Sequence, residues 1–212
     1  MDKSEFRKRM IEKRDALDPA KQAGFNHAIL AALTSLPVYR TAAVIFAYVS
    51  VGHEPDTRAL IYESLAAGKQ VCVPFCFAKG IMEAREIKAL DDLQNGKYGI
   101  PEPGGNCPIV PPGQIDLVVA PCVCADREGY RLGYGGGFYD RWLEKSRART
   151  SVLCYAEMVV DAVPRETHDI SVEMVITEHG AMMCDRQLGQ ANEPYCSVLC
   201  YDKNIRNIFA EE

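Results

Sequence analysis

The stretch RLGYGGGFYDR, residues 131–141, combines residue types that could bind a phosphate group. Four glycines stand within five positions, and backbone without Cβ atoms can turn sharply and bring its N–H groups against a phosphate. Arg131 and Arg141 add positive charge at the two ends. Asp140 would repel a phosphate unless it holds a Mg²⁺ ion that bridges phosphate oxygens. The stretch therefore indicates a phosphate loop with a metal ligand beside it.

This stretch matches neither of two common phosphate-binding motifs. It lacks the Lys-Ser/Thr pair that closes a Walker A loop, and Phe138 stands where the dinucleotide motif has its third glycine. A glycine-rich hairpin, or a helix start without a ligand, explains the glycines alone equally well. Asp140 and the basic segment at the N-terminus favour the phosphate interpretation.

The predicted elements place this loop at the edge of a sheet. Residues 42–49, 70–74 and 115–121 form apolar runs typical of buried strands. A helix capped by Asp56 and ending after Leu65 joins the first two runs, which predicts a β-α-β unit with parallel strands. Further strands are predicted at 82–87, 151–156 and 173–177, helices at 3–15, 19–33 and 139–145, and a long surface loop at 95–114. The fold class is α/β, with a three-layer, mostly parallel open sheet flanked by helices, and ligands bind beyond the carboxyl ends of strands in such sheets.

Composition limits the class of protein. The 212 residues carry a net charge of −5, and no broad basic face for nucleic acid is evident. No apolar run of about 18 residues predicts a membrane span, and the charged N-terminus lacks the apolar core of a secretory signal. The nine cysteines are odd in number, and several lie in apolar runs, which favours reduced thiols in a cytoplasmic protein. Cys196 and Cys200 leave a metal site near the C-terminus as an open alternative.

Residues 129–141 resemble the signature of the 5-formyltetrahydrofolate cyclo-ligase family, approximately G-x-R-L-G-x-G-x-G-[YF]-Y-D-R, and fit it in full. Other segments agree with that family in order: Lys3-x3-Arg7, His53–Thr57, Gly68-Lys69 before Pro74, Tyr98–Pro103, His168-Asp169 and Val175–Glu178. The resemblance covers about residues 3–180. It implies the α/β fold type shared with sugar-phosphate isomerases and coenzyme A transferases, with one domain at 1–182 and a C-terminal extension at 183–212.

The resemblance also implies a reaction. An enzyme of this family uses ATP and Mg²⁺ to convert 5-formyltetrahydrofolate, with or without a polyglutamate tail, to 5,10-methenyltetrahydrofolate, releasing ADP and phosphate. Transfer of the γ-phosphoryl group to the formyl oxygen makes that oxygen a good leaving group, and the second folate nitrogen then attacks the activated carbon. The protein mainly positions the groups and screens charge. A monomer or a weak homo-oligomer is expected.

The resemblance assigns residues to each part of this reaction. ATP contacts are expected at Lys3, Arg7, Arg131, Gly133, Tyr134, Gly135, Gly136, Gly137, Phe138, Tyr139 and Asp140. Folate contacts are expected at Val49, Glu54 and Tyr139, catalytic groups at Tyr139 and Arg131, and Mg²⁺ ligands at Asp140 and Glu173. Lys3 and Arg7 stand one helical turn apart, so both can reach a single triphosphate.

Each assignment has a structural alternative. Lys3 and Arg7 could form a solvated helix face, Glu54 could be a loop charge, and Tyr139 could pack in the core. Glu173 could equally be a solvent-side strand residue, and His168 is expected to have no catalytic part. The sequence departs from the family pattern at Ala125, Glu157 and Glu173.

Two other functions stand beside the enzyme. One is a non-catalytic nucleotide- or RNA-binding relative on the same scaffold, and the weaker one is a sugar-phosphate isomerase-like enzyme without ATP. The joint presence of the N-terminal basic pair, Glu54 and Asp140 favours the ATP-dependent cyclo-ligase.

Overall fold

An eight-stranded sheet forms the centre of the computed structural model, which describes residues 2–96 and 99–184. In spatial order its strands are β13 (Gly180–Met183), β12 (Met174–Thr177), β10 (Arg149–Leu153), β7 (Leu117–Ala120), β1 (Val44–Ala47), β2 (Gln70–Ala78), β3 (Ile81–Ile87) and β6 (Ile109–Val110). Neighbouring strands from β12 to β2 pair in parallel, whereas β13, β3 and β6 pair antiparallel at the two edges. The predicted mostly parallel sheet is confirmed.

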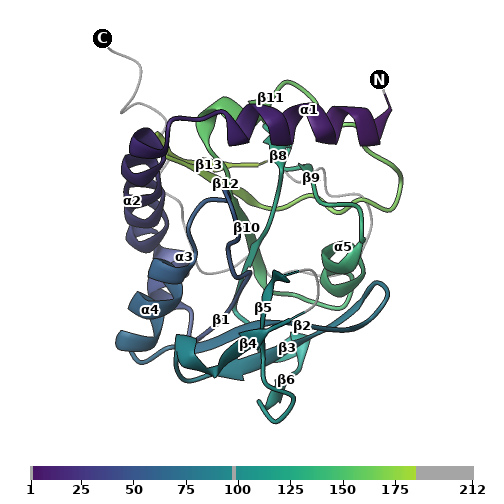
Figure 1. Cartoon of the computed structure of the whole chain (residues 1–212). Helices are drawn as coiled ribbons and strands as arrows, with labels where there is room; N and C mark the ends of the chain where they lie inside the picture. The colour runs from purple at the N-terminus through teal and green to yellow at the C-terminus, as the bar shows by residue number, and fades with distance from the viewer. Residues whose placement is uncertain (1, 97–98, 185–212) are drawn as a thin grey trace, which may run out of the picture.

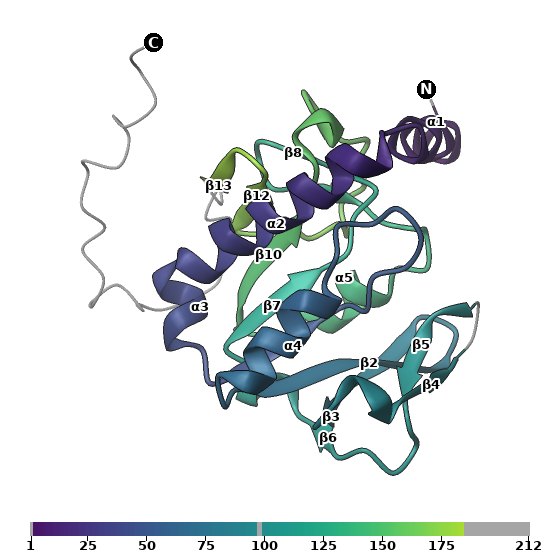
Figure 2. The ribbon, with the colours of Figure 1, turned by 60° about the vertical axis from the view of Figure 1, so that its left-hand side comes forward.

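Helices cover both faces of this sheet. They are α1 (Lys3–Asp15), α2 (Pro19–Ser35), α3 (Pro37–Thr41), α4 (Arg58–Ala66) and α5 (Phe138–Leu143). Figure 1 shows α2, α3 and α4 on one side of the sheet and α5 on the other, with α1 crossing above β8 and β9. Figure 2 shows α2 continuing towards α3, next to the parallel strands. This is the predicted three-layer arrangement.

The strand sequences explain the centre of the fold. Strand β7 is apolar along its length, β12 is apolar as far as Ile176, and both are buried at every residue, as is typical of parallel strands covered on both faces. Phe46 of β1 is fully buried, and its ring lies 4.6 Å from that of Trp142 and 5.8 Å from that of Tyr139, measured between centroids. Burying such a side chain stabilises the fold by about 1.5–3 kcal/mol. Phe46 therefore anchors α5 to the middle of the sheet.

Local signals set several helix ends as expected. Asp18 accepts a hydrogen bond from the Ala20 amide at 2.9 Å, and Pro19 occupies the first position of α2. Helix α4 begins at Arg58 with Thr57 at its N-cap position, but the Asp56 carboxylate still accepts from the Arg58 amide at 2.8 Å. The predicted β-α-β unit is therefore present as β1–α4–β2, with β1 and β2 parallel.

One prediction needs correction, and two short strands were not predicted. The expected long loop at 95–114 contains the short strands β5 (Pro101–Pro103), paired with β4 (Leu93–Asn95), and β6 at the edge of the main sheet. Between β7 and the glycine stretch lie β8 (Cys124–Asp126) and β9 (Arg131–Leu132), which form a small sheet with β11 (Val159–Val160). Strands of two or three residues are too short to show a period of two, so the sequence pattern does not reveal them.

The C-terminal extension begins inside an ordered element. Strand β13 runs to Met183, across the expected boundary after residue 182, and the Cys184 amide donates to the Glu173 carbonyl at 2.8 Å. Cys196, Cys200 and the rest of 185–212 lie outside the described residues. Among the cysteines in the described part, the free thiols include Cys72, Cys107, Cys122, Cys124 and Cys154. Within that same part, no helix is long and apolar enough to cross a membrane.

Candidate active site

The glycine stretch forms a loop between β9 and α5. Gly135 and Gly137 have φ values of 93° and 61°, in the left-handed region that glycine adopts at little cost. Gly137 occupies the N-cap position of α5, which has only six residues. Because so short a helix carries few aligned peptide dipoles, positive charge at the loop comes mainly from arginine side chains.

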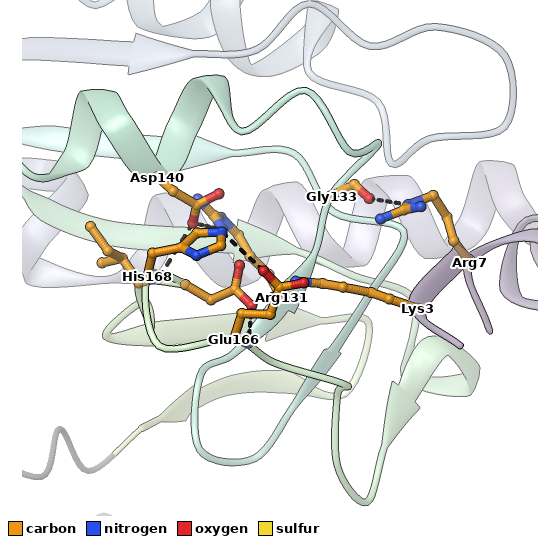
Figure 3. A network of polar contacts seen from close by, with 9 residues as sticks. Lys3, Arg7, Arg131, Gly133, Asp140, Glu166 and His168 are labelled. Atoms are coloured by element: carbon orange, nitrogen blue, oxygen red, sulfur yellow. Dashed lines mark hydrogen bonds and ion pairs between the residues drawn. The ribbon is translucent and has the colours of Figure 1, made fainter. Parts of the chain in front are cut away.

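Helix α1 brings Arg7 of the predicted basic pair to this loop and Lys3 to the segment at 166–169 (Figure 3). The Arg7 Nε donates to the Gly133 carbonyl at 2.7 Å, and its guanidinium lies against Gly135. One turn earlier, the Lys3 Nζ donates to Asp169 Oδ2 at 2.7 Å and lies 3.9 Å from Glu166 Oε1. The pair is therefore held against the body of the protein and does not form the alternative solvated helix face.

Arg131 and Asp140 form a buried ion pair. The Arg131 Nη1 lies 3.0 Å from Asp140 Oδ1, and 3% of the Arg131 side chain is exposed. Asp140 Oδ1 also accepts from the Ile170 amide at 3.3 Å. Arg131 Nε and Nη2 are buried without a hydrogen-bond partner among the described residues. Unsatisfied buried donors are costly and rare, so they indicate a place where a ligand acceptor would be stabilised.

Tyr139 has the same property. Its ring stacks on Phe46, and its hydroxyl is buried with no hydrogen-bond partner within the described ranges. Burial raises the pKa of Tyr139 well above the usual range, and the Arg131 charge opposes that rise. Tyr139 therefore packs in the core, as the structural alternative predicted. It also has a neutral hydroxyl that can donate to a ligand.

Glu54 lies in the segment between β1 and α4, five residues after the buried Val49. Its side chain is 7% exposed, and its two carboxylate oxygens accept from the Tyr134 hydroxyl at 2.6 Å and the Val51 amide at 2.8 Å. Burial raises the pKa of Glu54, while both hydrogen bonds and the charge of Arg14 act to lower it. Glu54 is therefore buried and hydrogen-bonded. This differs from the alternative in which it is simply a charged residue of a loop.

A cavity of about 560 Å³ opens beside Glu54. Its lining is mainly polar and includes Gln22, Asn26, Ser50 and Asp56. Amide, hydroxyl and carboxylate groups at one cavity can satisfy a heterocycle that carries both donors and acceptors. The cavity thus places hydrogen-bonding groups within reach of the carboxylate.

Glu173 lies apart from the arrangement around Asp140. It precedes β12, and its carboxylate accepts from Arg149 Nε of β10 at the amino ends of the two strands. Within the described residues, no group of three or more His, Cys, Asp or Glu side chains is placed to hold a metal. The structure thus brings Arg7, the glycine loop and Asp140 together, and the metal function expected of Glu173 stays a prediction.

Sequence reasoning assigned no role to two further groups at the site, Arg14 and Asp169. Arg14 is 5% exposed and donates from Nη1 to the Tyr134 hydroxyl at 2.9 Å. Asp169 receives Lys3, and although burial would raise its pKa, the hydrogen bonds from Lys3 and the Glu166 amide keep it below the usual value. His168 is exposed and pairs only with Glu166 at 3.5 Å. The family-like His168-Asp169 pair was the available signal for Asp169.

The contacts of Arg141 explain why residues 131–141 end in arginine. Its Nε donates to the Gly80 carbonyl at 2.8 Å, at the tip of the β2–β3 hairpin, and its Nη2 donates to the Gly136 carbonyl. The guanidinium also lies against Gly137, where an added Cβ would stand 3.0 Å from Nη1. Arg141 therefore joins the hairpin tip to the glycine loop.

Replacing Arg141 with alanine should loosen both segments. Loss of two hydrogen bonds, worth about 1 kcal/mol each, should speed amide hydrogen exchange by about 10-fold at residues 78–81 and 133–137. Exchange measured by mass spectrometry checks this, with the exposed Arg147→Ala as the matched control. Unchanged protection in the Arg141 variant would show that the hairpin and loop are held by other contacts.

Known proteins resemble the chain over most of its length. The model of the 5-formyltetrahydrofolate cyclo-ligase family matches residues 1–178. The 5-formyltetrahydrofolate cyclo-ligase of Mycolicibacterium smegmatis is 31% identical over 190 residues, which cover 82% of this chain and 93% of the relative. The enzyme of the same name from Escherichia coli K12 is 30% identical over 172 residues, covering 78% and 94%.

Solved structures agree with these relatives. The solution structure of the 5,10-methenyltetrahydrofolate synthetase of Aquifex aeolicus superposes with a TM-score of 0.79 at 28% identity, covering 93% of this chain and 99% of that one. The synthetase of Mycoplasma pneumoniae, at 21% identity and a TM-score of 0.70, shows the same fold. The signature at the glycine loop, the fold and the extent of these matches lead to one conclusion: the chain belongs to the 5-formyltetrahydrofolate cyclo-ligase family.

Proposed function

We propose that this chain is a 5-formyltetrahydrofolate cyclo-ligase, forming 5,10-methenyltetrahydrofolate from 5-formyltetrahydrofolate with hydrolysis of ATP to ADP and phosphate. The observation that carries the proposal is the meeting of Arg7, the glycine loop and Glu54 at one site in a chain of this family. Cations and open backbone suit the triphosphate on one side of the site. The buried carboxylate and its polar cavity suit the folate on the other.

The chemistry needs an activated formyl oxygen. The γ-phosphorus forms a bond to that oxygen as its bond to the ADP oxygen breaks. The second folate nitrogen then bonds to the formyl carbon and loses its proton, and the carbon–oxygen bond breaks to release phosphate. Little covalent work falls to the protein, because positioning and charge stabilisation account for most catalysis of phosphoryl transfer.

Five side chains have the chemistry for these steps. Lys3 and Arg7 would bind the phosphates, since Arg gives a planar fork of donors and Lys a compact charge. The unpaired Arg131 nitrogens and the Tyr139 hydroxyl would donate to oxygens that gain negative charge during transfer. Glu54 would accept hydrogen bonds from N–H groups of the pterin. An ionised carboxylate suits this role because both of its oxygens are acceptors.

The residues present fit a Mg²⁺ ion that enters with ATP. Both hydrogen bonds to Asp140 from described residues end on Oδ1, so Oδ2 is the oxygen that would meet a cation. Mg²⁺ commonly uses one or two carboxylates together with substrate phosphates, so a single carboxylate is sufficient at such a site. When bound, the ion would neutralise phosphate charge.

Following methenyl absorbance tests the proposed function. We expect product only when 5-formyltetrahydrofolate, ATP and Mg²⁺ are all present, and none after Mg²⁺ is removed by a chelator. Product without ATP, or folded protein that forms no product under any condition, would refute the assignment. Nucleotide binding without turnover would instead support the non-catalytic relative. Use of a polyglutamate tail and a monomeric or weakly self-associating state stay predictions.

A further inference from the structure

The Tyr134 hydroxyl lies between two buried charged side chains. It donates to Glu54 Oε1 at 2.6 Å and accepts from Arg14 Nη1 at 2.9 Å. The Arg14 Cζ also lies 5.8 Å from the centroid of the Tyr134 ring. Glu54 and Arg14 are 7% and 5% exposed, whereas Tyr134 as a whole is 49% exposed. The ring therefore faces solvent while its hydroxyl reaches into the protein.

These three residues come from three separate segments. Arg14 lies in the last turn of α1, Tyr134 in the glycine loop, and Glu54 in the segment after β1. Tyr134 stands between Gly133, whose carbonyl accepts from Arg7, and Gly135, whose backbone is left-handed. A phosphate held by this loop would fix the backbone on both sides of Tyr134. The tyrosine is thus a direct physical link between the loop and the Glu54 carboxylate.

The hydrogen bond from Tyr134 affects the charge state of Glu54. Desolvation disfavours the ionised form of a buried carboxylate, and hydrogen bonds donated to it oppose that effect. The Tyr134 hydroxyl and the Val51 amide supply these bonds, one to each oxygen of Glu54. Val51 is a neighbour in the same segment, whereas Tyr134 comes from the glycine loop. The loop therefore controls one of the two donors that orient the carboxylate and oppose the rise of its pKa on burial.

We propose that Tyr134 is a positioning residue that couples the glycine loop to Glu54, so that nucleotide and folate bind with positive cooperativity. This inference rests on the proposed function, which places ATP at the loop and folate at Glu54. The loop, Tyr134 and Glu54 must be ordered together. Whichever ligand binds first bears most of that ordering cost, and the second binds more tightly.

Titration calorimetry measures the coupling. The dissociation constant of 5-formyltetrahydrofolate is determined with and without a non-hydrolysable ATP analogue and Mg²⁺. In the unaltered protein the analogue should tighten folate binding by about 5-fold or more, the usual lower range for coupled sites. In Tyr134→Phe, which keeps the ring and loses the hydroxyl, that ratio should fall to about one.

Two further variants keep the test decisive. Tyr62→Phe removes a hydroxyl from an exposed tyrosine of α4 and should retain the full ratio. Arg14→Lys keeps the charge but loses the planar fork that reaches Tyr134, so its ratio should fall between one and the unaltered value. A ratio of one in the unaltered protein, or the unaltered ratio in Tyr134→Phe, would overturn the inference.

The inference and the proposed function fail in different ways. Methenyl formation by the unaltered protein depends only on the proposed function. If that activity is present and the coupling ratio does not respond to Tyr134→Phe, only the inference is wrong. If neither ligand binds the unaltered protein, the proposed function itself is wrong, and the inference falls with it.

Discussion

Replacing Asp140 with alanine is expected to lower kcat for methenyl formation by about 100-fold or more, because the transferred phosphoryl group loses the charge stabilisation of a bound metal. The structure places this carboxylate beside the glycine loop, with Oδ1 on Arg131. The assay follows initial rates at saturating ATP and folate while Mg²⁺ is varied. A rise in the Mg²⁺ concentration needed for half-maximal rate would accompany the loss of kcat.

The same substitution should also lower the free energy of unfolding. It leaves the Arg131 charge buried without its partner, and breaking a buried ion pair in this way typically costs about 3–5 kcal/mol. Asp140→Asn separates the two effects, because the amide oxygen still accepts from Arg131 but binds a cation poorly. It should melt closer to the unaltered protein and remain nearly inactive. The exposed Asp161→Ala is the control, and near-normal turnover of both Asp140 variants would contradict the metal assignment.

Substitutions at the two ends of the site should separate the two substrates. Arg7→Ala and Lys3→Ala should weaken binding of an ATP analogue by about 1–3 kcal/mol each, the usual loss for a hydrogen bond to a charged group. Their affinity for folate alone should change much less. Glu54→Ala should show the reverse, since its carboxylate lines the polar cavity proposed for the folate, whereas the described hydrogen bonds of Lys3 and Arg7 go to other residues.

Calorimetric titration of each variant with each ligand gives this contrast. Arg9→Ala is a matched control because Arg9 is an exposed arginine on the same helix as Arg7. A general folding defect would weaken both ligands together and is thereby recognised. If Glu54→Ala left folate binding intact while Lys3→Ala abolished it, the two ends of the site would be reversed.

Features encoded by neighbouring residues were predictable from the sequence. Asp18-Pro19 specifies the start of α2, apolar runs specify the buried parallel strands, and the glycines of 133–137 specify a loop with left-handed backbone. The short strands β8 and β9 were missed, since two or three residues show no periodicity. The sequence therefore predicted the conformation of segments whose structure depends on neighbouring residues.

Pairings across the chain were not predictable in the same way. Arg131 and Asp140 were both named, but as an ATP contact and a metal ligand, and their ion pair appears only in the structure. Tyr134 and Glu54 are 80 residues apart, and no residue pattern connects them. Glu173 contacts Arg149 at the amino ends of β10 and β12, a pairing that strand register sets and no local pattern reveals, and its expected metal role stays a prediction.

Helix α1 is made early in synthesis, yet its partners come late in the chain. Arg14, Arg7 and Lys3 contact residues 120, 126 and 166 positions further on. These contacts give α1 a high contact order. The chain must therefore lose the entropy of closing very long loops before the docked helix gains free energy from its contacts. A nascent chain that ends before Asp169 can form the helix but cannot complete its anchoring. The side of the site that we propose for the triphosphate therefore gains all its α1 contacts only on a chain synthesised almost to the end of the sheet, and incomplete chains do not have them all.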